Sequence, residues 1–501
     1  MKQGKWLHEW KKITACLLLA AAAAYCLLTL LRPGEGLDGI LAAMRMATRC
    51  VALVGAAVLL LRPQMKPERM FLLLGLLLGL CYVFMLVPLA SPDEQAHYRY
   101  ALTVASQWLN GGLTADANYL DFSGLTPHEN SAEALQAFLS GLTQETLTGE
   151  NVAFAAGHTS YPLMYLPQIL AFLLGMVLRL NRFWLYVLGD LFCLGCYLAL
   201  MSLAIRIIPR GKMPMALCGL VPVALQQAAS LSTDGITMGM AWLVIALAVR
   251  AMEQERRLTA RDMVTLGAAC VLLAPAKAVY ILLLGLLPMI PASRFSGKKQ
   301  KWLFVGLVVC LACAATFAFQ LAWLQEMAAA EGGEGANYSF GWIFTHPLET
   351  VRLVAKSIIP FGIYFYLETG IGSSLAGLTL EVHSGFIWTM ILLLLASALF
   401  LPREEKPLPG WKRGSFAGIF LLVLLACAAT MMVAWTPAGD DLIQGVQGRY
   451  LLPAAPLLLM ALGSGSFESK RDIALPCRLG FVLMELLVLN DVINHFAGLT
   501  F

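Results

Sequence analysis

The chain has 501 residues, of which 59% are hydrophobic and only 13% are charged, and its mean hydropathy is +0.72. A soluble protein of this length needs far more charge to cover its surface, so the composition excludes an ordinary soluble fold. The net charge of +4 is small and spread along the chain, which gives no reason to expect nucleic acid as a partner.

Long apolar runs predict helices that cross a lipid bilayer. A span needs roughly 20 apolar residues, because only a helix satisfies its own backbone hydrogen bonds in lipid. The first run follows four lysines and is long for a cleaved signal sequence, so we expect a retained anchor. The clearest runs cover residues 13–31, 70–90, 390–401 and 416–433.

The positions of Lys and Arg predict the orientation, since these residues are enriched in cytoplasmic loops. Seven basic groups beside the apolar runs are assigned to the inside, and residues 91–182 then lie outside. The groups are the N-terminus, Arg62/Lys66/Arg69, Arg206/Arg210/Lys212, Arg250/Arg256/Arg257/Arg261, Arg294/Lys298/Lys299/Lys301, Arg403/Lys406/Lys412/Arg413 and Lys470/Arg471/Arg478.

This assignment leaves three irregular apolar segments. Residues 161–180 and 347–367 have both ends outside, so we expect juxtamembrane or re-entrant helices at the outer interface. A plain span beside a locally inverted loop is the alternative for each. Residues 263–291 have both ends inside, and Pro275 and Lys277 interrupt them. Two half-length helices meeting near Pro275 would place Lys277 near the outer leaflet.

The predicted fold is therefore all-α, a polytopic integral membrane protein with roughly 13 transmembrane helices. The N-terminus is cytoplasmic and the C-terminus lies outside. No internal repeat is visible, which weakens an inverted-repeat transporter. The predicted regions are N-terminal spans (1–90), a large outer loop with an interfacial helix (91–183), middle spans with a broken hairpin (184–323), a second outer loop with an interfacial helix (324–382) and C-terminal spans (383–501).

The 12 cysteines lie almost wholly inside apolar runs. Cys193 and Cys196, and likewise Cys310 and Cys313, have the spacing of redox or zinc pairs. Both pairs fall in the middle of a predicted span with no second pair nearby. We interpret them as small apolar packing residues.

An acidic motif, Ser91 to His97, stands where the third span leaves the membrane. Adjacent carboxylates at a bilayer edge lose hydration and repel each other, so the pKa values of Asp93 and Glu94 should separate. One can then act as a base near neutral pH. His97 falls one helical turn later on the same face, and Arg99 adds a cation. The structural alternative is a helix N-terminus whose acidic residues favour the positive end of the helix dipole.

Three further clusters are predicted on the same side. Asp234 ends a short turn between two spans, and capping the next helix is its alternative role. Lys277 lies in an apolar hairpin, where an ammonium is usually functional or paired, although it could extend to the interface instead. Arg449, followed by Tyr450, suits a phosphate or carboxylate because its fork donates two parallel hydrogen bonds. A lipid-headgroup anchor is the alternative for Arg449.

Four motifs resemble a known family. They are PDE-x-x-H at 92–97, Y-P at 161–162, ASLSTDG at 229–235 and GRY-x-x-P at 448–453. In this order they look like the bacterial family called domain of unknown function 2142, which is related to the GT-C superfamily of membrane glycosyltransferases. The similarity runs from about residue 70 to 456. Gln95 stands where proline is common in the family, and the Y-P motif lacks the frequent second proline.

The resemblance implies a GT-C-like fold and an inverting transferase in the bacterial inner membrane. Its donor would be a polyprenyl-phosphate sugar, and its acceptor a cell-envelope glycan or lipid on the outer face. Carried onto this chain, the general base is Asp93, with Glu94 as partner or alternate base. The substrate-binding set is His97, Arg99, Asp234, Lys277, Arg449 and Tyr450.

A divalent cation, Mg or Mn, bound by Asp93, Glu94 and His97 stays open at this stage, because carboxylates suit these ions but some relatives need none. Two other functions stay open as well. One is a transporter or flippase for a lipid-linked anionic intermediate, and the other is a protein that binds such an intermediate without turnover. Transporters more often place ionisable groups at mid-membrane, which favours the enzyme.

Overall fold

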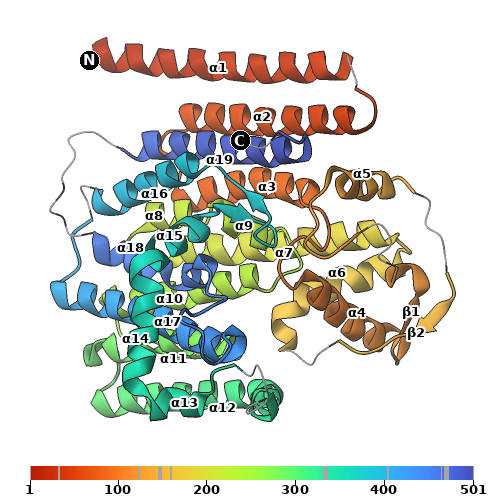
Figure 1. Ribbon diagram of the computed structural model, residues 1–501. Coiled ribbons are helices and arrows are strands. Elements are labelled where there is room, and N and C mark those ends of the chain that lie inside the picture. The colour runs from red at the N-terminus through yellow and green to blue at the C-terminus, as the bar shows by residue number, and fades with distance from the viewer. Residues whose placement is uncertain are drawn as a thin grey trace.

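The computed structural model describes residues 2–31, 34–121, 125–144, 149–157, 161–330, 337–402, 405–463, 465, 467 and 473–499. Within them the chain is helical, with two small antiparallel sheets (Figure 1). Three of the basic residues assigned to the inside, Arg403, Lys470 and Arg471, lie outside the described residues.

The α-helices carry most of the described structure. They are α1 (Lys2–Leu31), α2 (Gly36–Leu61), α3 (Pro67–Met85), α4 (Glu94–Asn110), α5 (Ala132–Gly141), α6 (Leu166–Val177), α7 (Arg182–Ile207), α8 (Lys212–Cys218), α9 (Pro222–Ala228), α10 (Asp234–Glu253), α11 (Ala260–Leu273), α12 (Lys298–Ala330), α13 (Phe340–Thr345), α14 (Pro347–Ser357), α15 (Ile363–Ile371), α16 (Ser384–Leu399), α17 (Gly410–Trp435), α18 (Ala455–Leu462) and α19 (Ala474–Phe496).

Shorter elements connect these helices. The 3-10 segments are η1 (Ala117–Tyr119), η2 (Pro162–Tyr165), η3 (Ala278–Met289), η4 (Ala292–Arg294) and η6 (Gly448–Ala454), and η5 (Ile358–Gly362) is a π-helical turn. Strands β1 (Thr114–Asp116) and β2 (Asn151–Ala153) pair antiparallel, with Ala115 opposite Val152. Strands β3 (Ser374–Leu375) and β4 (Leu380–Glu381) form the second hairpin.

Seven helices in the described part of the chain are long and apolar enough to cross a membrane, namely α1, α2, α3, α7, α10, α12 and α17. Four shorter apolar segments accompany them, at 162–177, 278–289, 384–399 and 448–462. The prediction of an all-helical polytopic membrane protein is thereby confirmed. The total of roughly 13 crossings stays a prediction, because it depends on how many of the short segments cross.

Helix α10 is the most buried of the seven, and α7, α9, α11, η3 and η6 pack against it. Helix α7 packs against α10 on one side and α3 on the other, and α2 joins α1 to α19. Outer helices present apolar residues to their surroundings: Leu30 of α1 is 69% exposed and Leu303 of α12 is 68% exposed. Such faces suit lipid rather than water.

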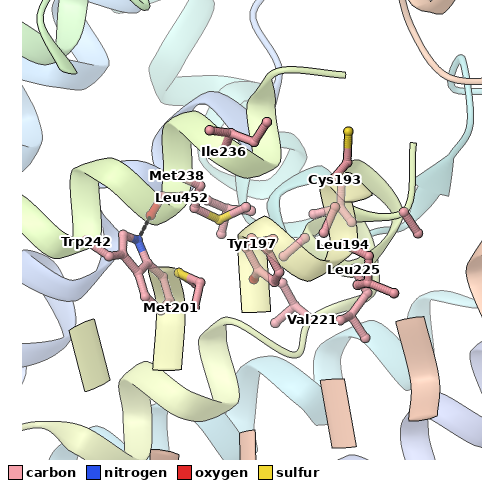
Figure 2. Close-up of a cluster of buried hydrophobic side chains, with 14 of the residues drawn as sticks. Cys193, Leu194, Tyr197, Met201, Val221, Leu225, Ile236, Met238, Trp242 and Leu452 are labelled. Atoms are coloured by element: carbon pink, nitrogen blue, oxygen red, sulfur yellow. Dashed lines mark hydrogen bonds between the residues drawn. The ribbon is translucent and has the colours of Figure 1, made fainter. Parts of the chain in front are cut away.

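Apolar side chains of α7, α9 and α10 interlock at the centre, where Cys193, Tyr197 and Trp242 are buried (Figure 2). Cys193 is a free thiol in this apolar cluster, in agreement with a packing role. Within the cluster the indole Nε1 of Trp242 donates to the carbonyl oxygen of Leu452 at 2.9 Å. A buried indole needs such a partner, and the bond holds η6 against α10.

The segment predicted to be a broken hairpin consists of α11 and η3. Helix α11 ends at Leu273, and Lys277 has an extended backbone with φ −148° before η3 begins. Both halves pack on α12. The break at residues 274–277 thus places Lys277 at the tip of the hairpin.

The segment predicted to be the second interfacial helix forms α14, η5 and α15, and α14 runs across the direction of the long helices in Figure 1. Leu348 and Val351 of α14 are 81% and 66% exposed, whereas Leu353 is buried. Arg352 and Lys356 lie on the same short helix. This amphipathic pattern is typical of a helix lying along a membrane surface.

The connections at one end of the bundle contact one another. Arg210 donates to Glu253 Oε2 at 2.9 Å and to the carbonyl oxygen of Lys406, and the Gly211 amide donates to Glu405 Oε1 at 3.0 Å. These loops are among those that the charge pattern assigns to the inside. The connections that it assigns to the outside meet at the other end of α10, and they form the candidate site.

Candidate functional site

Asp234, the first residue of α10, lies between two cations that come from distant parts of the chain. Lys277 Nζ is 2.5 Å from Asp234 Oδ1, and Arg449 Nε is 3.6 Å from Asp234 Oδ2. The Arg449 side chain is only 9% exposed, and that of Asp234 is 19% exposed. Removal of these charges from water is costly unless they are paired, so each cation requires the carboxylate.

Tyr450 completes the group that we call the cationic cluster, defined as Asp234, Lys277, Arg449 and Tyr450. Lys277 Nζ lies 4.9 Å and Arg449 Cζ 5.2 Å from the centre of the Tyr450 ring. The Tyr280 hydroxyl donates to the Tyr450 carbonyl oxygen at 3.0 Å and fixes this turn of η6. Two cations share one carboxylate and one ring face, so the cluster retains an excess of positive charge that suits an anion.

Glu94 is buried, with 3% of its surface exposed. Its carboxylate accepts hydrogen bonds from the backbone amides of Ser91 at 3.1 Å and Leu231 at 3.2 Å. Each oxygen therefore has a backbone donor, and the side chain joins the start of α4 to the turn before α10. Burial raises the pKa of Glu94 to about 7, against the effect of the backbone donors.

Asp93 contrasts with its neighbour. It is exposed, its backbone is left-handed with φ 58°, and its side chain makes no capping hydrogen bond although it holds the N-cap position of α4. Its negative charge acts on both His97 and Arg449. An accessible carboxylate thus acts electrostatically on Arg449 of the cationic cluster, and its backbone conformation costs energy for most residues and less for Asp.

His97, the last residue of the acidic motif, is influenced by the charges of the cationic cluster. Its Nδ1 is 2.7 Å from the Tyr165 hydroxyl, at the end of η2. Burial lowers the pKa of His97 to about 4, and the nearby charges of Asp234 and Lys277 act on it in opposite directions. The imidazole is therefore neutral at neutral pH and serves as a hydrogen-bonding group. The Arg99 side chain lies at the exposed surface of α4 rather than in the cluster.

The three residues considered for a divalent cation do not form a ligand set. The Glu94 oxygens accept backbone amides, a ring nitrogen of His97 bonds to Tyr165, and only Asp93 is exposed. No group of three His, Cys, Asp or Glu residues placed to hold a metal occurs in the described ranges. These residues do not fit Mg or Mn, so the chemistry derived below uses no metal.

Two buried glutamines belong to the site but were not predicted from the sequence, because the prediction considered charged residues and not amides. Gln226 and Gln227 of α9 are 1% and 2% exposed, and they line cavities that adjoin Arg449. The available signal was two consecutive glutamines inside an otherwise apolar run, because polar side chains at membrane depth are costly and mark functional positions. Tyr165 and Tyr280, which hold His97 and the Tyr450 turn, carried no such signal.

A family model described as "Predicted membrane protein (DUF2142)" matches residues 76–458. That stretch includes the acidic motif and every member of the cationic cluster. No curated protein matches the chain, and no solved structure matches it.

Proposed function

The chain belongs to the DUF2142 family of predicted membrane proteins, and from that membership and the site we propose that it is an inverting membrane glycosyltransferase of the GT-C type. Its donor is a polyprenyl-phosphate sugar, and its acceptor is a glycan or lipid of the bacterial cell envelope. In this proposal the chain lies in the inner membrane with the site on the outer face.

The observation that carries the proposal is the exposed Asp93 carboxylate beside a cluster in which two cations share one carboxylate. Transfer of a sugar from a phosphate needs a base at the acceptor hydroxyl and positive charge at the leaving group. Asp93 supplies the first, while Lys277 and Arg449 supply the second. Glu94 serves as the support that fixes the position of Asp93.

The reaction is a direct displacement. Asp93 takes the proton of the acceptor hydroxyl, whose oxygen attacks the anomeric carbon and inverts it. The bond to the phosphate oxygen breaks, and the polyprenyl phosphate leaves with its negative charge beside Lys277 and Arg449. Neutral His97, held by Tyr165, presents hydrogen-bonding capacity to the sugar or phosphate without adding charge.

Transport is the second candidate, and the position of the cluster argues against it. Asp234 is the first residue of α10, and Lys277 lies at the tip of a hairpin. Both are therefore at the end of a span, whereas transporters usually bind their substrates near the bilayer midplane.

The test is turnover of the purified protein in liposomes that contain a panel of polyprenyl-phosphate sugars and candidate acceptors. The readout is release of free polyprenyl phosphate. We expect wild type to release it, Asp93→Asn to be inactive, and Glu133→Gln, an exposed carboxylate-to-amide change in α5, to match wild type. Absence of turnover with every donor, while bound lipid is still detected, would favour transport or binding without chemistry.

A further inference from the structure

Helix α9 buries two amide side chains that have no hydrogen-bond partner among the described residues. Both polar atoms of the Gln226 amide and both of the Gln227 amide lack a hydrogen-bond partner within the described part of the chain. The helix is otherwise apolar and its surroundings are packed. Burial of unpaired amides is unfavourable, and buried polar groups normally have partners. The amides thus indicate a polar occupant that the protein itself does not supply.

Two small cavities lie where these amides meet Arg449. Gln227 and Arg449 line both of them. The first cavity also reaches Asp234 and Tyr280. The second contains a further set of polar residues, namely Gln226, Thr369, Ser374 and Gln447. Arg449, a member of the cationic cluster, therefore also lines a neutral, amide-rich cavity.

A larger cavity of about 230 Å³ continues from the second one. Gln447 and Leu378 line both cavities. At its outer side Phe365 and Leu442 are 42% and 45% exposed, so the cavity opens to the surface beside α15. The shared residues form a continuous series from that opening, past the glutamines, to Asp234.

We propose that the cavity lined by Gln226, Gln227 and Gln447 is the subsite for the sugar ring of the lipid-linked donor. This inference rests on the proposed function, and it names the part of the site that recognises the neutral portion of the substrate. Each amide both donates and accepts, which matches a hydroxyl group, whereas a phosphate needs only donors. Arg449, which lines this cavity and with Lys277 supplies the positive charge for the phosphate, then lies where the sugar and the phosphate meet. Each of the two inner cavities has a volume of only about 10 Å³, so the proposal requires Gln447 and Leu378, which line both the second cavity and the larger one, to move apart when the donor binds.

The test compares the binding of two lipids that differ only in the sugar. Affinities for undecaprenyl phosphate and for undecaprenyl phosphate linked to one hexose or pentose are measured in detergent on wild type, Gln227→Leu and Gln136→Leu. Gln136 is exposed on α5 and serves as the matched control. The ratio of the two dissociation constants isolates the contribution of the sugar.

We expect wild type and Gln136→Leu to bind at least one sugar-bearing lipid about tenfold more tightly than the sugar-free lipid. In Gln227→Leu this ratio should fall close to one while the affinity for the sugar-free lipid stays within twofold, which also shows that the variant is folded. If Gln227→Leu does not fold, Gln227→Asn is used instead. Its side chain is shorter by one carbon, so the amide no longer reaches the sugar and the ratio should also fall.

A wild-type ratio close to one for every sugar, or a glutamine variant that keeps the wild-type ratio, overturns the subsite. Turnover of wild type is recorded separately, in the liposome assay above. If wild type turns over but its ratio of dissociation constants is near one, the transferase proposal holds and the sugar subsite is wrong. If that ratio depends on Gln227 but no turnover is detected, the sugar subsite holds and the transferase proposal is wrong.

Discussion

The acidic motif at the start of α4 and the cationic cluster at the start of α10 place their carboxylates in different environments. In the motif, Glu94 is buried against backbone amides while Asp93 is exposed and makes no capping bond. In the cluster, Asp234 lies between Lys277 and Arg449. In the proposed mechanism the partners of each carboxylate decide its role: Glu94 is structural, Asp234 balances cations, and Asp93 accepts a proton.

The largest combined effect on turnover and stability is expected from Lys277→Met, which removes one of the two cations that flank Asp234. Turnover should fall by about 10²-fold or more, because charge stabilisation of the leaving phosphate is lost. Stability should also fall, by about 2–3 kcal/mol, since a buried carboxylate loses its nearest partner but Lys277 is about one-third exposed.

A second substitution tests the charge balance. In Lys277→Met the Asp234–Arg449 pair remains, whereas Lys277→Met/Asp234→Asn leaves the Arg449 side chain, which is 9% exposed, without a carboxylate, so the melting temperature should not recover and turnover should stay low. Recovery of turnover along with stability would show that Lys277 serves only to balance Asp234.

Glu94→Gln tests the buried carboxylate of the acidic motif. The amide cannot accept on both sides as the carboxylate does, so the bond to Ser91 or to Leu231 is lost. We expect a loss of about 1–3 kcal/mol in stability, seen as a lower melting temperature in detergent, and a decrease in turnover of less than about tenfold. Abolished turnover at an unchanged melting temperature would make Glu94, and not Asp93, the base.

The pH dependence of stability tests whether Glu94 is buried in the folded protein. The pKa of Glu94 is raised to about 7, so the folded carboxyl keeps a proton that the unfolded chain releases above about 4.5. Its contribution to stability is therefore full below about pH 4.5 and is lost as the pH rises to about 7. The difference in melting temperature between wild type and Glu94→Gln should change in that direction over this range.

His97 should show the opposite trend. Its pKa is lowered to about 4, so its contribution is present above about pH 6.5 and is lost as the pH falls toward 4. Melting curves of wild type and His97→Gln from pH 4 to 8 measure it. A wild-type minus His97→Gln difference that does not vary with pH would mean that His97 is not buried as described.

The smallest effect concerns the backbone at Asp93. Asparagine tolerates its left-handed conformation and alanine does not, so Asp93→Ala should be less stable than Asp93→Asn by about 1 kcal/mol. Both variants lack the carboxylate and should be equally inactive. Equal melting temperatures would show that the turn relaxes when Asp93 is replaced.

Much of this arrangement could be predicted from the sequence. Apolar length predicts the long helices, and Pro275 and Lys277 mark the break between α11 and η3. Basic residues separate the loops into two sets, and the loops within each set contact one another. These features depend on composition and local chemistry, which the sequence displays directly.

Other features depend on contacts between distant segments and could not be read from spacing. Asp234 meets Lys277 and Arg449, which lie far along the chain, only after α10, η3 and η6 have packed. The division of roles between Asp93 and Glu94 follows from one left-handed residue at the turn. Adjacent residues of the same charge give no indication of which one will face inward.

The most direct test is a single-turnover measurement on protein saturated with a polyprenyl-phosphate sugar, with wild type beside Asp93→Asn. Donor binding and the rate of polyprenyl phosphate release after acceptor addition are recorded on the same sample. We predict donor affinities within twofold of each other and a release rate about 10²–10⁴-fold slower in Asp93→Asn, the usual range for loss of a general base. Equal release rates at equal donor occupancy would contradict the assignment of Asp93 as the base.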